Sequence, residues 1–312
     1  LDGASKIPDL VKRAKELNMP AVGITDHGNM HGAYEMWSTA VKEGVKPIIG
    51  IEAYVTPETA RQDQTRVSWD TNWNPDIDPQ HRRRNPNDVS GGGLITHLTM
   101  WAETDEGLVN LMKASTDANL EGRVMRYPRM DKEILAKYSK GIIASSGCPS
   151  GIIQTRLLLG QFDEALRAAG ELQDIFGRDN FYIEFMDHGL KIEKQVTDGL
   201  LDIAKKLNAP LLATNDSHYV RAEDAGSQDA MLCINSGSTL DEPGRFKFDG
   251  TGYYLKSAEE MRELFKHIPE ACDNTLEIAE RCNVMFDDHE DGAFMPQFDC
   301  PEGWDETSLF LK

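Results

Sequence analysis

The sequence predicts an α/β fold with a mainly parallel sheet. Apolar runs of strand length recur along the chain, rich in Ile, Leu and Val and without clean alternation, which is typical of strands buried on both faces. Between them lie segments with apolar residues three and four apart, as on one face of a helix. This alternation indicates either an open doubly wound sheet or most of a barrel.

Six strands and four helices follow from these two patterns. The continuous apolar runs predict strands at 20–25, 47–54, 94–101, 141–145, 180–185 and 209–214. The helical spacing predicts helices at 7–17, 105–115, 161–175 and 191–207. After about residue 220 the alternation stops, and "GYYLKSAEEMRELFKHIPEACDNTLEIAERC" predicts two short helices after a Tyr-rich turn.

One connection is too long for a plain loop. Residues 56–93 are polar and rich in Gly, Pro and Asn, which predicts a mobile insertion. We therefore expect a barrel domain at 1–220 that carries this insertion, and a helical C-terminal extension at 221–312.

Composition limits the class of protein. The chain carries 33 Lys and Arg against 52 Asp and Glu, a formal charge of −19, which repels a phosphate backbone over most of the surface. Five cysteines without a CxxC pair indicate neither a disulfide framework nor a zinc ribbon. The sequence shows no signal peptide and no membrane-length apolar run, so we expect a cytoplasmic protein without a membrane partner.

Metal-competent side chains occur at or near the ends of five predicted strands. In a parallel barrel the carboxyl ends of the strands meet at one mouth, so residues far apart in sequence can share one site. The candidates are Asp26, His27, Glu52, His97, Cys148, Asp216 and His218.

Each candidate also has an ordinary structural explanation. His97 alone is more often a hydrogen-bonded core histidine, and Cys148 alone a small buried hydrophobe. Asp216 and His218 fit an Asx turn as well as a pair of ligands. Glu52 is harder to explain, because a carboxylate buried beside Ile51 is costly unless it is paired or coordinated.

Six segments resemble the polymerase-and-histidinol-phosphatase (PHP) domain, in the branch found at the N-terminus of bacterial DNA polymerase III alpha subunits. They are, in order, "LDGASKI", "AVGITDHGNMHGAYEMW", "KPIIGIEAYV", "THLTMWAE", "GCPSGIIQTRL" and "LLATNDSHYV". "RFKFDGTGYYLKSAEEM" at 245–261 also resembles the polymerase branch. The resemblance implies an α/β fold that is a distorted seven-stranded β/α barrel, with up to three divalent metals: zinc first, with manganese or magnesium as alternatives.

The resemblance also implies the ligands and their grouping. One metal would be bound by Glu52, His97 and Cys148, a second by Asp2, His27 and His218, and a third by Glu52 and Asp216. Glu52, Asp216 and His218 would be catalytic. The family carries a His-x-His motif before "LDGA", and this chain starts after it, so we expect a missing first strand and a weakened third metal.

The activity implied is metal-dependent 3′–5′ exonuclease proofreading, as part of a DNA-directed DNA polymerase. Its implied partners are the DNA primer strand, the remaining polymerase domains, the sliding clamp and other replisome subunits. Nucleotide addition is expected beyond residue 312. Two alternatives stay open: a stand-alone small-molecule phosphatase, which the insertion and residues 245–261 disfavour, and a non-catalytic metal-stabilised scaffold. His188 could orient a phosphate or a ligand, or simply cap a helix.

Overall fold

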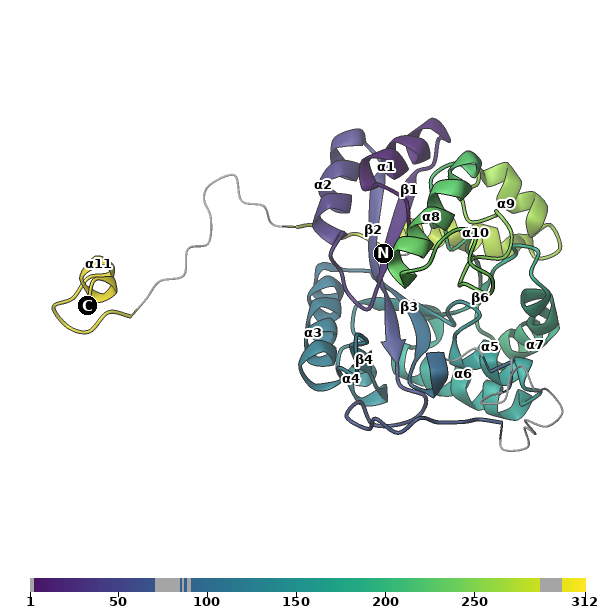
Figure 1. Cartoon of the computed structure of the whole chain (residues 1–312), viewed down its shortest axis with the longest axis horizontal. Helices are drawn as coiled ribbons and strands as arrows, with labels where there is room; N and C mark the ends of the chain where they lie inside the picture. Colours follow the sequence, from purple (N-terminus) through teal and green to yellow (C-terminus); the bar gives the residue numbers. More distant parts are fainter. Residues whose placement is uncertain (1–2, 71–84, 86, 89–90, 287–298) are drawn as a thin grey trace.

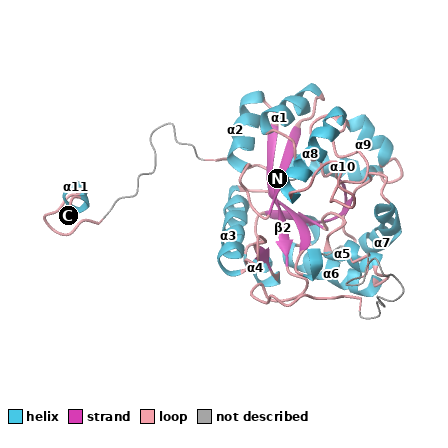
Figure 2. Ribbon diagram, viewed as in Figure 1, coloured by secondary structure: helices cyan, strands magenta, loops and turns pink. Residues whose placement is uncertain are grey.

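A curled, half-barrel sheet with helices packed around it forms the body of the molecule (Figures 1 and 2). This computed structural model describes residues 3–70, 85, 87–88, 91–286 and 299–312. The α/β class, which was predicted because strand-length apolar runs alternate along the chain with helical patterns, is confirmed.

The described chain contains seven strands, one more than the apolar runs predict. The order across the sheet is β1-β2-β3-β5-β6-β7, and β4 pairs with β2 beside this path. Since β4 has only two residues, it is too short for a recognisable apolar run, and the prediction of six strands missed it. The strands are β1 (Ala21–His27), β2 (Lys46–Val55), β3 (Thr96–Ala102), β4 (Arg129–Met130), β5 (Ile142–Ser145), β6 (Phe181–Phe185) and β7 (Leu211–Ala213).

The sheet is mainly parallel, as predicted, with one antiparallel strand. The pairs β1·β2, β2·β4, β5·β6 and β6·β7 are parallel, whereas β3 runs antiparallel to both β2 and β5. The amino end of β3 therefore lies beside the carboxyl ends of its neighbours, with His97 opposite Tyr54 of β2. His97 reaches the common mouth from the start of its strand and not from its end.

The four predicted helices are present, with further helices between them. They are α1 (Ile7–Glu16), α3 (Asp105–Glu121), α6 (Phe162–Phe176) and α7 (Lys191–Leu207). Five helices were not predicted from the sequence: α2 (Ala33–Glu43), α4 (Lys132–Lys137), α5 (Ile152–Leu158), α8 (Ala225–Ser236) and α11 (Glu306–Phe310). The two short helices predicted after the Tyr-rich turn are α9 (Ala258–Leu264) and α10 (Pro269–Arg281).

Both faces of the sheet are covered, which explains why the strands lack alternation. In β6, Phe181 and Ile183 join the large core formed with the surrounding helices, whereas Tyr182 between them faces a second apolar cluster. Ile278 in the last turn of α10 and Cys282 just after that helix belong to the second cluster. The segment after residue 220 therefore covers one face of the sheet, although the domain boundary at 220 itself stays a prediction.

The described part of the insertion is anchored to the body. Arg129 is fully buried and donates hydrogen bonds to the carbonyl oxygens of Arg61 (2.6 Å), Asp63 (2.8 Å) and Leu94 (3.3 Å). Residues 71–84, 86 and 89–90 of the predicted insertion lie outside the described residues.

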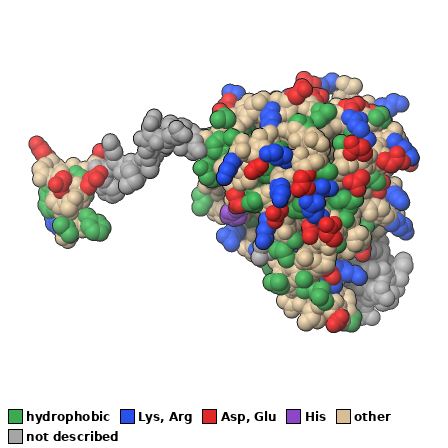
Figure 3. Space-filling view, turned by 90° about the horizontal axis from the view of Figure 1, so that it is seen from above, with side chains coloured by type: hydrophobic (Ala, Val, Ile, Leu, Met, Phe, Trp, Pro, Cys, Tyr) green, Lys and Arg blue, Asp and Glu red, His purple; other side chains and the backbone are tan. Residues whose placement is uncertain are grey.

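The surface and the cysteines agree with the composition. On the face seen from above, Lys and Arg side chains are interspersed with Asp and Glu (Figure 3). All five cysteines are free thiols. Among the described residues, none of the helices is both long and apolar enough to span a bilayer.

Candidate metal centre

Glu52 lies at the centre of the candidate site. The parallel register of β1 and β2 puts His27 beside Glu52, and its Nδ1 atom lies 3.3 Å from Glu52 Oε2. From the other side, His97 Nδ1 of β3 lies 2.7 Å from Glu52 Oε1. The Glu52 residue is only 6% exposed, so this carboxylate is buried between two imidazole rings.

Cys148 reaches the same carboxylate from the loop after β5. Its sulfur lies 3.3 Å from His97 Nδ1 and 3.4 Å from Glu52 Oε1. The chain turns at Gly147 with φ of 81°, a conformation that glycine adopts readily. The structure thus brings together four of the predicted ligands: a carboxylate, two imidazoles and a thiol.

The charges in this cluster have opposite effects on its two acids. Burial opposes the ionisation of Glu52, but the charge and hydrogen bond of His97, with a contribution from His27, hold its pKa well below the usual range. Burial and the negative charge of Glu52 raise the pKa of the Cys148 thiol. In the chain without a cation, Cys148 is therefore a protonated thiol, and binding a metal would release its proton.

Asp216 and His218 lie on the turn after β7. Asp216 has φ of 44°, which is unusual for a residue other than glycine. Nδ1 of His218 donates to the backbone oxygen of Asp216 at 2.7 Å, because a carbonyl oxygen can only accept. This contact fixes the tautomer and leaves Nε2 of His218 with the lone pair that a metal needs.

Asp216 interacts electrostatically with Glu52 and His27. Burial raises its pKa and the charge of Glu52 adds to the rise, while His218, His188 and His27 act in the opposite direction. Asp2 lies outside the described residues, but the chain just after it contacts the turn, since Ala4 N donates to the oxygen of His218 at 2.7 Å. The predicted grouping of Asp2 and His27 with His218 stays a prediction.

Glu184 is a site residue that the sequence analysis missed. It is 3% exposed and accepts hydrogen bonds from Ser145 Oγ (2.5 Å), Gly147 N (3.1 Å) and Thr214 Oγ1 (2.5 Å). It thereby connects the loop of Cys148 to the end of β7. The signal was available, because Glu184 stands between apolar residues in "NFYIEF", as Glu52 does in "IIGIEAY".

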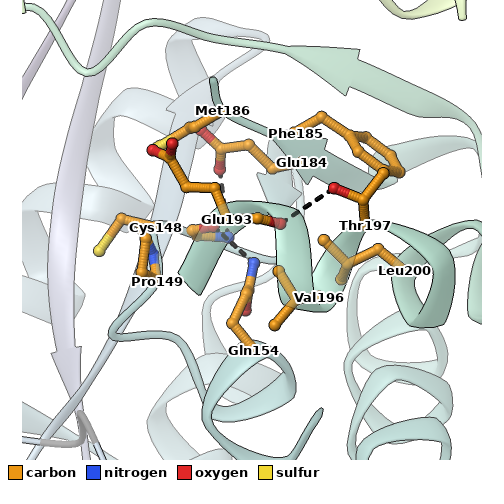
Figure 4. A pocket seen from close by; sticks show the side chains of 11 residues that line it. Cys148, Pro149, Gln154, Glu184, Phe185, Met186, Glu193, Val196, Thr197 and Leu200 are labelled. Atoms are coloured by element: carbon orange, nitrogen blue, oxygen red, sulfur yellow. Dashed lines mark hydrogen bonds between the residues drawn. The ribbon is translucent and has the colours of Figure 1, made fainter. Parts of the chain in front are cut away.

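His188 supports the Asp216 turn from behind. Its Nδ1 lies 2.6 Å from Glu193 Oε1 and its Nε2 lies 2.8 Å from the backbone oxygen of Asn215. Both partners are acceptors, so His188 satisfies them together only when both ring nitrogens carry a proton. Glu193 lines a pocket with Cys148 and Glu184 (Figure 4).

Comparison with known proteins gives three kinds of match. The PHP domain profile matches residues 1–188. The chain is 50% identical over 309 residues to "DNA polymerase III subunit alpha" of Mycobacterium tuberculosis, which is 99% of this chain and 25% of that protein. It is 55% identical over 282 residues to the protein of the same name from Saccharopolyspora erythraea, covering 90% and 23%. The chain thus spans about a quarter of these relatives.

A solved structure from Bifidobacterium adolescentis also matches. It is 17% identical with a TM-score of 0.40, and the match covers 85% of this chain and 92% of that one. This likeness is too distant to indicate a function.

Proposed function

We propose, because this chain belongs to the PHP domain family, that it is a metal-dependent phosphoesterase region of a bacterial DNA polymerase III alpha subunit. In this proposal it is a 3′–5′ exonuclease that removes nucleotides from the primer strand. The remaining polymerase domains, the sliding clamp and other replisome subunits are its further proposed partners.

The observation that carries the proposal is the four-donor cluster around Glu52. Imidazole nitrogen, thiol sulfur and carboxylate oxygen are donors that suit zinc, and Glu52, His97 and Cys148 offer all three within 3.4 Å of one another. A buried carboxylate with these neighbours fits a bound cation. We propose zinc at this cluster. At proposed metal sites whose ligands are mainly carboxylates, we propose zinc, manganese or magnesium.

Divalent cations at this mouth would supply a water of lowered pKa and neutralise phosphoryl oxygens. The chain's own residues provide the framework for this chemistry. Glu52 lies between the two imidazoles, and Asp216 and His218 come from a single turn, so that one turn presents both groups to a phosphate. We propose these three as the catalytic residues. The ring orientation of His218 is held by its Nδ1 hydrogen bond, as described above.

Digestion of a 3′-labelled single-stranded oligonucleotide tests the proposal. With zinc or manganese, the chain should release nucleotides stepwise from the 3′ end, and chelation should abolish the release. Replacing His218 with Ala should lower the rate by orders of magnitude with little loss of secondary structure. His267→Ala, which removes an exposed histidine, is the matched control.

The outcomes separate the alternatives. Equal release by the wild type and His218→Ala would contradict the assignment of the site. Rapid hydrolysis of a chromogenic monophosphate without digestion of the oligonucleotide would favour a small-molecule phosphatase. Elemental analysis measures the metal content. Bound metal that stabilises the chain, without hydrolysis of either substrate, would favour a scaffold.

A further inference from the structure

We propose that the turn at residues 123–127, between α3 and β4, binds the single-stranded substrate beside the metal centre. In this proposal Tyr127 packs against a base and Arg126 contacts a backbone phosphate. The inference rests on the proposed function and identifies where that site would hold its substrate.

A continuous series of rings links the turn to the candidate ligands. The ring of Tyr54 is stacked on His27, with centroids 5.9 Å apart and planes 4° apart, and lies 5.5 Å from the ring of His97. Tyr127 meets Tyr54 edge to face, at 5.1 Å and 82°. Tyr127 is therefore separated from two candidate ligands by a single side chain, and a strand bound at the metals would pass close to it.

The turn has a defined shape. Val124 and Tyr127 exchange two backbone hydrogen bonds of 3.0 Å, so Met125 and Arg126 form a two-residue tip. Met125 has φ of 55° and is 74% exposed. Val124, by contrast, is buried against Leu94 and its neighbours. The tip projects from an anchored base, so its side chains are presented to solvent without a large entropic cost of ordering the backbone on binding.

The charge of the turn is opposite to that of the chain as a whole. Arg123 and Arg126 are both exposed, in a protein of formal charge −19. The guanidinium carbon of Arg126 lies 5.3 Å from the centre of the Tyr127 ring. A cation beside an aromatic face is the combination that binds single-stranded nucleic acid without sequence preference.

Four variants test this inference: Tyr127→Ala, Tyr127→Phe, Arg126→Ala and the control Arg178→Ala. Arg178 is exposed and precedes β6, at the amino end of that strand, so its loss changes the charge equally without touching the turn. Binding of a labelled oligothymidylate is measured by fluorescence anisotropy at several salt concentrations. KM and kcat are measured on the same strand and on bis(p-nitrophenyl) phosphate, which has no base.

Tyr127→Ala should raise the Kd and KM for the oligonucleotide about tenfold, as expected for loss of one stacked base, and should change kcat less. Tyr127→Phe should restore binding, because only the ring is needed. Arg126→Ala should weaken binding and reduce the slope of log K against log salt by about one. The KM for the small ester should rise less than that for the oligonucleotide, and Arg178→Ala should match the wild type.

Two results would overturn the inference. One is wild-type affinity in both Tyr127→Ala and Arg126→Ala, which would leave the exonuclease proposal standing if the strand is still digested and would favour a protein partner for the turn. The other is an equal loss on both substrates, which would indicate damage to the metal centre. Binding through the turn without digestion would support the inference and contradict the exonuclease.

Discussion

Replacing Glu184 with Gln should stabilise the metal-free chain at neutral pH. Burial raises the pKa of Glu184 from 4.5 to about 7 against the hydrogen bonds of Ser145 and Thr214, and the charges of Asp216 and Glu52 add to the rise. Between these two pH values the folded chain keeps a proton that the unfolded chain has released. The contribution of Glu184 to the free energy of unfolding is therefore fully present below pH 4.5, and it decreases as the pH rises towards 7.

The size of the effect follows from the two pKa values. Gln carries no charge, so the free energy of unfolding of the variant, relative to wild type, should increase by about 1 kcal/mol at pH 5, about 2 at pH 6 and about 3 at pH 8. Each difference is counted from the value at pH 4 or below, where both side chains are neutral. Groups that do not interact with Glu184 titrate alike in both proteins, so their contribution cancels in the difference.

Denaturant unfolding followed by circular dichroism, with a chelator present, measures this difference. Glu193→Gln is the matched control with the opposite sign. Burial also opposes the ionisation of Glu193, but the hydrogen bond and charge of His188 lower its pKa, so its stabilising effect is present at neutral pH and lost in acid. A difference between Glu184→Gln and wild type that stays constant from pH 5 to pH 8 would refute the reasoning.

Two further predictions concern support of the site and packing. His188→Ala removes the donor to the carbonyl next to Asp216, so zinc affinity measured against a competing chelator dye should fall about 10- to 100-fold; an unchanged affinity would contradict this role. Gly107→Ala in α3 would place a methyl carbon 1.7 Å from the backbone oxygen of Gly141. This clash should lower the free energy of unfolding, measured in urea, by more than about 2 kcal/mol. In Gly226→Ala in α8 the added methyl meets nothing within 4 Å, so the free energy of unfolding should rise by about 0.5–1 kcal/mol. A Gly226→Ala variant less stable than Gly107→Ala would contradict this packing.

The sequence indicated β2, β3, β5 and β6 well because most of their residues are buried, on both faces of the sheet. A continuous apolar run, however, contains no information about strand direction, so the antiparallel course of β3 could not be predicted. Burial of β3 on both sides still placed His97 in a strand, and the reversed direction brings it to the mouth from the amino end. The two-residue strand β4 has no pattern of its own, since its position depends on pairing with β2.

The candidate site could be predicted in part for a different reason. A carboxylate in an apolar strand needs a partner, and this argument identified Glu52 before its neighbours were known. The same argument applies to Glu184, which stands between apolar residues near the end of the predicted strand at 180–185 and so also needs a partner. The contacts of Tyr127 and Arg126 depend on how the turn folds back on Tyr54, which no local spacing indicates.

The turn that carries Asp216 depends on residues far beyond the matched PHP region. The side-chain amide of Asn215 donates to the backbone oxygen of Tyr254 at 2.6 Å, and Lys256 Nζ donates to Asn215 Oδ1 at 2.6 Å. The amide nitrogen of His218 donates to the oxygen of Tyr253 at 2.8 Å. A non-glycine residue at positive φ costs about 1–3 kcal/mol and persists only where its surroundings enforce it. The segment 252–256 provides that enforcement on one side and His188 on the other, so these residues are part of the framework that positions Asp216 and His218, although they lie outside the proposed ligand set.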